Sequence, residues 1–422
     1  MSDSALEAKA ALSDRTPVVL LTGRAGTGKS HFIRTLVDAD PGYPQALLAP
    51  TGLAAMNIGG QTVHSFFGFP PRPLIGNHEK PNWFFTRTAR ALRRLIIDEV
   101  SMLRADVLDA MDQHLKVARK SSRPFGGVQM LLVGDFYQLP PVVRGEESAL
   151  LEEAGYASPY AFSAHALRDA PLAAHELTEV HRQSDLDFIA LLSAIREQRG
   201  VEDAVATLND HCLERALSQR PVLLCATNAV ADAYNRRGLE SLSGVAAKYS
   251  GGFEGEAPRA QGDRFPAPIE LILKRGARVI FTQNDPDGRW VNGSLGTVKA
   301  LDETIISVAL DAGEDVDVER AVWPQARWSW NAKENRMEVK EEFKYVQFPL
   351  APAWALTIHK AQGMTLDAVE IDLGRGAFAS GQTYVALSRA RSMEGLKLTR
   401  PLSPRDVRVD PAIAEGLARL GA

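Results

Sequence analysis

The sequence predicts an α/β protein of more than one lobe, in which parallel sheets are flanked by helices. Short apolar runs alternate with helical stretches along the chain, which is the pattern of parallel strands joined by helices. With 422 residues the chain is longer than one ordinary hydrophobic core, so we expect two or more lobes. The apolar runs that we expect to be strands are 18–21, 45–49, 95–97, 130–133, 222–224 and 279–281.

The composition restricts the class of protein. Hydrophobic residues make up 45% of the chain and charged residues 24%, as in soluble globular proteins. A formal net charge of −4 excludes a generally basic nucleic-acid coat, so any nucleic acid must bind in a local groove. Only Cys212 and Cys225 occur, which excludes a disulfide framework and a cysteine-rich zinc site. The N-terminus lacks the apolar core of a signal peptide, and no apolar run is long enough to span a membrane. We therefore expect a cytoplasmic protein of a bacterial nucleoid, and a nuclear or mitochondrial location stays open.

The first strand leads into a phosphate-binding loop. Residues 23–30 read GRAGTGKS and match the pattern G-x-x-x-x-G-K-[ST], between the apolar run 18–21 and a helical stretch at 31–37. Backbone N–H groups of such a loop and the positive end of the following helix surround a phosphate. Lys29 would reach the β- and γ-phosphates of a nucleotide, and the Ser30 hydroxyl would ligate Mg²⁺. The alternative is a chance glycine turn before a helix.

Two acids follow the strand at 95–97. Asp98 at the strand tip suits Mg²⁺ coordination, and Glu99 is placed to polarise an attacking water. The alternative is a strand end with two solvated acids. The distance from the phosphate loop favours the catalytic interpretation.

The strand at 130–133 ends in the segment 134–141, GDFYQLPP. Gln138 could hydrogen-bond the γ-phosphate or the lytic water, and so sense whether ATP is intact. Phe136 and Tyr137 are candidates for stacking on unpaired bases, and a role in the core is equally compatible with the sequence.

Two arginines lie far along the chain from the phosphate loop. Arg182 and Arg389, supplied from a second lobe, would stabilise charge on the transferred phosphoryl group and make hydrolysis depend on closure. Each is also compatible with a surface salt bridge.

Three stretches depart from the alternation of strands and helices. Residues 66–90 are rich in proline and aromatic residues and predict a small excursion from the first sheet. Short alternating strands between 297 and 349, at 304–310 and 343–348, predict an antiparallel β insert. Residues 251–268 are rich in glycine and proline and predict a long loop.

The order of these blocks resembles superfamily-one DNA helicases of the petite-integration-frequency (PIF) type, which are related to RecD. The resemblance covers nearly the whole chain. The blocks that resemble helicase motifs I, Ia, II, III, IV, V and VI are 23–30, 48–52 with 62–67, 98–102, 134–141, 181–183, 355–366 and 385–391.

This resemblance implies two RecA-like lobes with ATP between them and single-stranded DNA across their top. It also implies 5′→3′ translocation and duplex unwinding, with RNA–DNA hybrids and G-quadruplexes left open as substrates. The first lobe would comprise 1–65 and 91–170, and the second 171–296 and 350–400. A wedge at 66–90, an SH3-like β insert at 297–349 and a short tail at 401–422 would complete the chain.

The resemblance also assigns residues to the two expected sites. Catalysis would use Lys29, Glu99, Gln138, Arg182 and Arg389, and Mg²⁺ would bind Ser30 and Asp98. The nucleotide would further contact Gly23, Ala25, Gly26, Thr27, Gly28, Lys29, Ser30, Gln362 and Gly363. DNA would contact Pro50, Thr51, His64, Phe67, Asn228, Thr357, His359 and Lys360, each of which could instead cap a helix or fill the core.

The expected cofactors are ATP and Mg²⁺, and the expected partners are single-stranded and forked duplex DNA, with no membrane. We expect a monomer, with a dimer on DNA left open. No glutamine precedes the phosphate loop, the first being Gln45, so selectivity for adenine stays open. Two other interpretations remain. One is an ATP-gated translocase that binds single strands or strips proteins without strong unwinding, and the other is a P-loop switch that acts on proteins.

Overall fold

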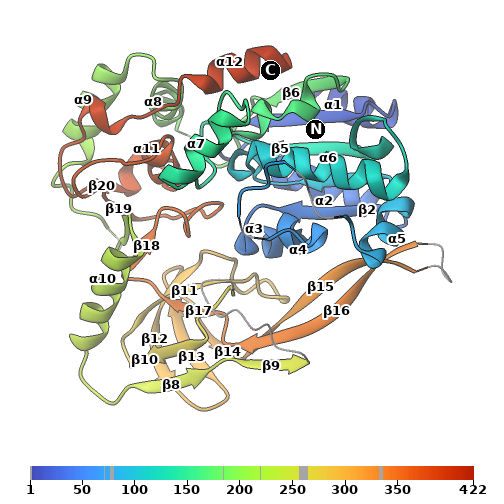
Figure 1. Ribbon diagram of the computed structural model, residues 1–422. Coiled ribbons are helices and arrows are strands. Elements are labelled where there is room, and N and C mark those ends of the chain that lie inside the picture. Colours follow the sequence, from blue (N-terminus) through green and yellow to red (C-terminus); the bar gives the residue numbers. More distant parts are fainter. Residues whose placement is uncertain are drawn as a thin grey trace. The chain divides into compact units, whose positions relative to one another are not determined.

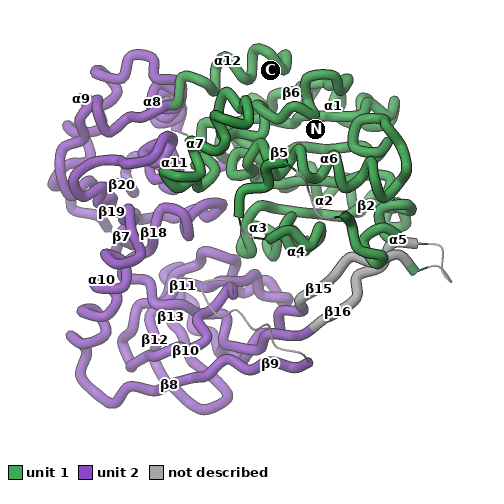
Figure 2. Tube along the Cα trace, viewed as in Figure 1, with its two compact units in different colours: residues 1–181, 326–341, 410–422 green, residues 182–325, 342–409 purple. Residues whose placement is uncertain are grey.

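The computed structural model describes residues 2–70, 72–76, 80–183, 185–218, 220–255, 265–331 and 336–422. Pro71 and residues 77–79 of the predicted wedge, 256–264 of the predicted loop, and 332–335 of the predicted insert lie outside the described residues. The chain forms two compact units, coloured separately in Figure 2. Unit 1 comprises Met1–His181, Ala326–Glu341 and Asp410–Ala422, and unit 2 comprises Arg182–Gln325 and Glu342–Val409.

Unit 1 is built on a six-stranded sheet in the order β3-β2-β4-β5-β1-β6, in which every pair of neighbours is parallel. The apolar runs predicted as strands at 18–21, 45–49, 95–97 and 130–133 are confirmed as β1, β2, β4 and β5. All residues of these strands are buried, as expected for strands covered on both faces. The strands of unit 1 are β1 (Val18–Gly23), β2 (Gln45–Ala49), β3 (Gln61–Thr62), β4 (Arg94–Ile97), β5 (Gln129–Gly134) and β6 (Leu172–Leu177).

Most helices of unit 1 lie between these strands along the chain, whereas α1 precedes β1 and α12 ends the chain (Figure 1). On α2, Phe32 and Ile33 pack into the core with Val19 and Leu21 of β1, as the helical spacing predicts. The helices are α1 (Asp3–Ser13), α2 (Lys29–Ala39), α3 (Gly52–Asn57), α4 (Val63–Phe67), α5 (Trp83–Ala91), η1 (Val100–Met102), α6 (Ala105–Arg119), η2 (Pro124–Gly127), α7 (Gly145–Glu153), η3 (Ala161–Ser163), η4 (His165–Leu167) and α12 (Ala412–Leu420).

Unit 2 contains a four-stranded parallel sheet in the order β18-β7-β19-β20. The predicted strand at 222–224 is its second member. The elements of this sheet and its helices are α8 (Leu186–Glu197), α9 (Val201–Cys212), β7 (Val222–Cys225), α10 (Asn228–Glu240), β18 (Ala355–Thr357), β19 (Val369–Asp372), α11 (Gln382–Leu387), η5 (Met393–Gly395), β20 (Leu396–Leu398) and η6 (Pro404–Asp406).

The antiparallel part of the chain is larger than the predicted insert. A five-stranded antiparallel sheet runs in the order β14-β13-β12-β11-β17, around a core that includes Phe281, Val308 and Phe348. The strands are β8 (Ala247–Ser250), β9 (Gly252–Gly255), β10 (Glu270–Leu273), β11 (Arg278–Phe281), β12 (Leu295–Leu301), β13 (Ile306–Leu310), β14 (Asp315–Val318), β15 (Ala321–Asn331), β16 (Arg336–Gln347) and β17 (Leu350–Pro352).

Three expectations need correction. The run at 279–281 is a strand, but its partners β12 and β17 are antiparallel to it, so it belongs to the β insert. The second lobe is expected from residue 171, yet β6 at Leu172–Leu177 pairs with β1 in unit 1. The start of the loop predicted at 251–268 instead forms β9, which pairs with β16.

The C-terminal segment is a helix rather than a tail. Helix α12, red in Figure 1, belongs to unit 1, where Gly416 lies so close to the Phe162 ring that an added Cβ would be 2.4 Å from it. In the described part of the chain, no helix has the length and apolar character needed to cross a membrane.

Candidate functional site

The phosphate loop connects β1 to α2 in unit 1. Helix α2 begins at Lys29, and its N-cap Gly28 has a φ of 87°, in the left-handed region that favours glycine. Gly26, with a φ of 81°, needs the same freedom. A loop of this kind before a helix N-terminus is the arrangement in which backbone N–H groups bind an anion.

Close packing explains the first glycine of the loop. A Cβ on Gly23 would lie 2.6 Å from the Leu177 carbonyl oxygen and 2.7 Å from Thr27 Oγ1. The Thr27 hydroxyl is buried and donates a 2.9 Å hydrogen bond to the Arg24 carbonyl oxygen. The Thr27 side chain therefore stabilises the loop conformation by a hydrogen bond within the loop. Ala25 is also buried.

The Lys29 ammonium lies over the loop, donating hydrogen bonds of 2.7 Å and 2.8 Å to the carbonyl oxygens of Gly23 and Arg24. Ser30 follows in the first turn of α2 and is exposed. A lysine ammonium held against the phosphate loop, with an exposed hydroxyl next to it in sequence, fits a nucleotide phosphate and its metal ion.

Asp98 and Glu99 follow β4 with different environments. Asp98 is buried, and its Oδ1 accepts a 2.9 Å hydrogen bond from the Glu99 backbone N–H. Burial, and then the Glu99 charge, raise the pKa of Asp98 from 3.8 to about 7. A buried carboxylate with a raised pKa is one that a divalent cation would stabilise in its ionised form, so Asp98 fits a Mg²⁺ ligand.

Glu99 has a strained backbone. Its φ of 52° and ψ of 44° lie in the left-handed region, which is uncommon for residues other than glycine. Its side chain is half-buried, whereas that of Asp98 is buried. Strain of this kind persists where the surroundings fix it and is common at functional sites.

The segment after β5 places an amide beside an acid. Gln138 is buried and donates from Nε2 to Asp135 Oδ2 at 3.4 Å, and Asp135 also accepts from the Tyr137 backbone N–H at 3.2 Å. Phe136 is only 1% exposed and packs edge-on against Tyr160 and Phe162, so the stacking role considered for Phe136 is wrong. Tyr137 is half-buried.

The sheet order explains why these residues meet. Strands β4, β5 and β1 are consecutive neighbours and parallel, so their carboxyl ends lie at one edge of the sheet. The phosphate loop follows β1, Asp98 follows β4 and Asp135 follows β5. Ligands of open parallel sheets bind at this edge.

In unit 2, both predicted arginines bind one short segment. Arg182 donates to the carbonyl oxygens of Gly363 and Ser388, at 3.2 Å and 3.4 Å. Arg389 is 1% exposed and donates to the carbonyl oxygens of Ala361 and Met364, at 3.4 Å and 3.3 Å. Because Arg389 is buried, the surface salt bridge considered for it is wrong.

Gln362 and Gly363 lie in this same segment, where Gln362 is half-buried and Gly363 is exposed with a φ of 84°. The structure thus brings Arg182, Arg389, Gln362 and Gly363 together within unit 2.

The DNA candidates of unit 1 follow β2 and β3. Pro50 and Thr51 are half-buried, and the Thr51 hydroxyl caps α3 by accepting from the Ala54 N–H at 3.3 Å. His64 is half-buried, and burial followed by the charge of Arg104 lowers its pKa, so it is neutral near pH 7. Phe67 is 3% exposed, stacked on Phe69 at 5.1 Å, so the expected contact of its ring with bases is corrected to a role in the core.

The DNA candidates of unit 2 follow the parallel neighbours β7 and β18. Asn228 is exposed at the start of α10, and Lys360 is exposed after β18. Thr357 is buried, with its hydroxyl accepting from the Lys360 N–H at 3.3 Å, so the capping alternative holds for this side chain. Burial lowers the pKa of His359, which makes it a neutral hydrogen-bonding group near pH 7.

Three aspartates on α6 were missed by sequence reasoning. Asp106 accepts from the Leu74 N–H at 2.7 Å, Asp109 from the Ala166 N–H at 2.7 Å, and Asp112 from the Phe125 N–H at 2.7 Å. Each acid thereby fixes a different loop to the helix that follows Glu99. Their spacing of three residues was a usable signal, because it places them on one helical face.

Comparison with known proteins identifies the family. Residues 4–203 match the PIF1-like helicase family. Among curated proteins, the chain is 37% identical over 393 residues to the ATP-dependent DNA helicase PIF1 of Danio rerio, covering 90% of this chain and 58% of that protein. It is 34% identical over 410 residues to the ATP-dependent DNA helicase Pif1 of Bdellovibrio bacteriovorus, covering 94% of this chain and 87% of that protein. The chain spans about three fifths of the length of the vertebrate relatives that it matches.

Solved structures confirm the fold. Bacteroides sp. Pif1 in complex with ADP-AlF4 superimposes with a TM-score of 0.89 at 31% identity, covering 98% of this chain and 95% of that one. Bacteroides Pif1 bound to single-stranded DNA superimposes with a TM-score of 0.71 at 32% identity, covering 99% and 96%. The predicted fold class, parallel sheets of the RecA-like kind with β inserts, is confirmed.

Proposed function

Because the chain belongs to the PIF1-like helicase family, we propose that it is an ATP-dependent DNA helicase, which moves 5′→3′ along single-stranded DNA and unwinds duplex. One observation carries the proposal from this chain's own residues. The phosphate loop, the buried Asp98 and the Asp135–Gln138 pair all follow neighbouring parallel strands, at one edge of one sheet. The direction of movement rests on the family resemblance.

In the proposed chemistry, the loop N–H groups and Lys29 bind the phosphates of ATP. Ser30 and Asp98 would hold Mg²⁺, which neutralises charge on the phosphate oxygens when bound. Glu99 accepts a proton from the attacking water, and Gln138 orients that water. The resemblance assigns Arg182 and Arg389 to the charge that develops on the γ-phosphate.

One short segment supports coupling between ATP and DNA. Residues 357–364 carry the DNA candidates His359 and Lys360 at one end and the carbonyl oxygens that bind Arg182 and Arg389 at the other. A shift of this segment on DNA binding would change the positions of both arginines. We therefore expect the strand to control the rate of ATP hydrolysis.

The grip on DNA would be made largely with phosphates. The proposed DNA contacts exclude the side chains of Phe67 and Thr357, because both are buried, and comprise Pro50, Thr51, His64, Asn228, His359 and Lys360. Such contacts do not read base edges, so affinity should depend on salt much more than on sequence.

The wedge proposal is supported by two exposed aromatic residues. Trp83 and Phe84 are 64% and 68% exposed at the start of α5, and the Arg87 guanidinium lies 5.8 Å from the Trp83 ring centre. Phe85, the next residue of this helix, is buried. We propose that the exposed pair meets the duplex end, which favours unwinding over strand binding alone.

The test is ATP hydrolysis with and without single-stranded DNA. We expect strong stimulation by oligo(dT), which Lys360→Ala weakens without changing hydrolysis in the absence of DNA. Stimulation should also fall as salt rises. Hydrolysis that is indifferent to DNA would overturn the proposal and favour a P-loop switch that acts on proteins.

A further inference from the structure

An exposed phenylalanine lies in the segment that follows strand β19 in unit 2. Phe378 is 58% exposed, while the residue before it, Ala377, is 2% exposed. The segment from Leu373 to Gly381 joins β19 to α11. Exposure of one ring is common at a protein surface, so the case for a ligand rests on how the segment is held and on where it lies in the sheet.

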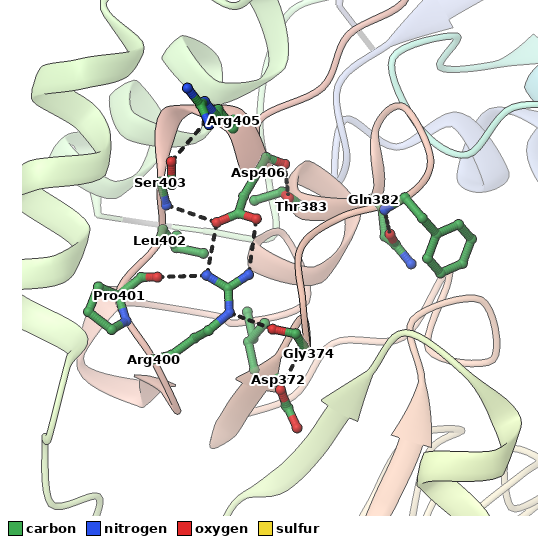
Figure 3. Close-up of polar contacts among 12 residues, drawn as sticks. Asp372, Gly374, Gln382, Thr383, Arg400, Pro401, Leu402, Ser403, Arg405 and Asp406 are labelled. Atoms are coloured by element: carbon green, nitrogen blue, oxygen red, sulfur yellow. Dashed lines mark hydrogen bonds and ion pairs between the residues drawn. The ribbon is translucent and has the colours of Figure 1, made fainter.

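A charged pair fixes this segment (Figure 3). The Arg400 guanidinium donates to both carboxylate oxygens of Asp406 at 3.0 Å, and its Nε donates to the Gly374 carbonyl oxygen at 2.8 Å. The Asp406 carboxylate also accepts from the backbone N–H groups of Ser403 and Ala377. Burial acts to raise the pKa of Asp406, but these hydrogen bonds lower it overall, so the carboxylate stays ionised.

The backbone is anchored on both sides of the ring. The Phe378 N–H donates to the buried Gln382 side-chain oxygen at 3.0 Å, and the Thr383 hydroxyl donates to the Asp406 carbonyl oxygen at 2.6 Å. Gly376 has a φ of 133°, and a Cβ there would lie 3.0 Å from Asp406 Oδ1. The ring is therefore presented by a preformed scaffold, which lowers the entropy lost when a flat ligand stacks on it.

We propose that Phe378 is a stacking platform for a nucleobase of the bound single strand. This inference rests on the proposed function, because it deepens the DNA grip of unit 2. An aromatic face stacks on any base, which suits a motor that must move along every sequence.

The position in the sheet favours a base of the strand. Strands β18, β7 and β19 are consecutive and parallel, so His359 and Lys360, then Asn228, then Phe378 follow strands that end at one edge. Arg375 is exposed three residues before Phe378. A cation for phosphate and an aromatic ring for the base, carried by one connecting segment, are the kinds of group that bind single strands.

The experiment measures affinity for oligo(dT) and for a strand of equal length made of abasic residues. Phe378→Ala should weaken oligo(dT) binding by about 5- to 150-fold, while Phe378→Trp should retain it. The abasic strand should bind wild type and Phe378→Ala equally, because no base is left to stack. Arg375→Ala is the matched control. Loss of one phosphate contact should reduce the slope of log affinity against log salt concentration by about 0.7. Phe378→Ala should leave that slope unchanged.

Several results would overturn this assignment. Equal affinity of wild type and Phe378→Ala for oligo(dT) would remove the stacking role. An equal loss on the abasic strand would show a structural effect. If Phe378→Ala instead raised only the KM for ATP measured without DNA, the base would be that of the nucleotide. If wild type bound no single strand at all, the proposed function itself would fail.

Discussion

A methyl group added at Gly134 tests whether the end of β5 positions the catalytic acid. The Cβ introduced by the substitution Gly134→Ala would lie 2.9 Å from the Val100 backbone nitrogen and 3.0 Å from Val100 Cγ1. Both distances are shorter than ordinary van der Waals contact, and the neighbour that must move is backbone directly after Glu99. Overpacking of this kind costs about 1–3 kcal/mol of stability. A displacement of a few tenths of an ångström at Glu99 should also lower kcat by about 3- to 10-fold, on the scale of about 10²-fold for 1 Å.

The matched control is Gly145→Ala, at the first residue of α7, where an added Cβ meets no atom within 4 Å. This variant should gain about 0.4–1 kcal/mol from reduced entropy of the unfolded chain and keep its kcat. Urea unfolding and single-strand-stimulated ATP hydrolysis measure both effects. The reasoning is refuted if Gly134→Ala unfolds at the wild-type urea concentration and retains wild-type kcat.

Three further predictions concern charged groups. Burial and the Glu99 charge raise the pKa of Asp98 to about 7, so the folded protein favours the neutral carboxylic acid and disfavours the ionised carboxylate. Without Mg²⁺, the free energy of unfolding should therefore fall by up to about 4 kcal/mol as the pH rises from about 4 to 7. Urea denaturation with a chelator present measures this fall, and Asp98→Asn should abolish it. Lys29→Ala should lose ATP binding, whereas Glu99→Gln should bind ATP and DNA but turn over slowly; near-normal turnover in Glu99→Gln would exclude its role as the base. Arg389→Lys keeps the positive charge, but an ammonium group cannot donate to all the carbonyl oxygens that the buried Arg389 guanidinium binds. The variant should therefore lose about 1–3 kcal/mol of stability as well as turnover. An unchanged melting temperature would contradict this packing role.

The phosphate loop and its neighbouring strands could be predicted because their signals are local. An apolar run bounded by glycines or acids defines β1, β4 and β5, and the positions of Lys29 and Asp98 follow from the strand ends. The parallel order of these strands then brings both residues to one edge.

Partners distant in sequence could not be predicted in this way. The run at 279–281 looks like a parallel buried strand, but its neighbours are the antiparallel strands β12 and β17. An aromatic residue next to a motif gives no sign of which way it points, so Phe67 and Phe136 are candidate DNA contacts by sequence although both are buried. The motif around Arg389 predicts a catalytic role, but nothing in it indicates that the guanidinium also holds four neighbouring polar groups in unit 2.

Strand displacement on tailed duplexes tests the central claim most directly. Duplexes carrying either a 5′ or a 3′ single-stranded tail are incubated with ATP and Mg²⁺, with Glu99→Gln as the control that binds but turns over slowly. The account predicts unwinding of the 5′-tailed duplex by wild type and little unwinding by the control. Unwinding only from 3′ tails would contradict the direction of movement, and ATP hydrolysis on single strands without any unwinding would contradict the helicase assignment.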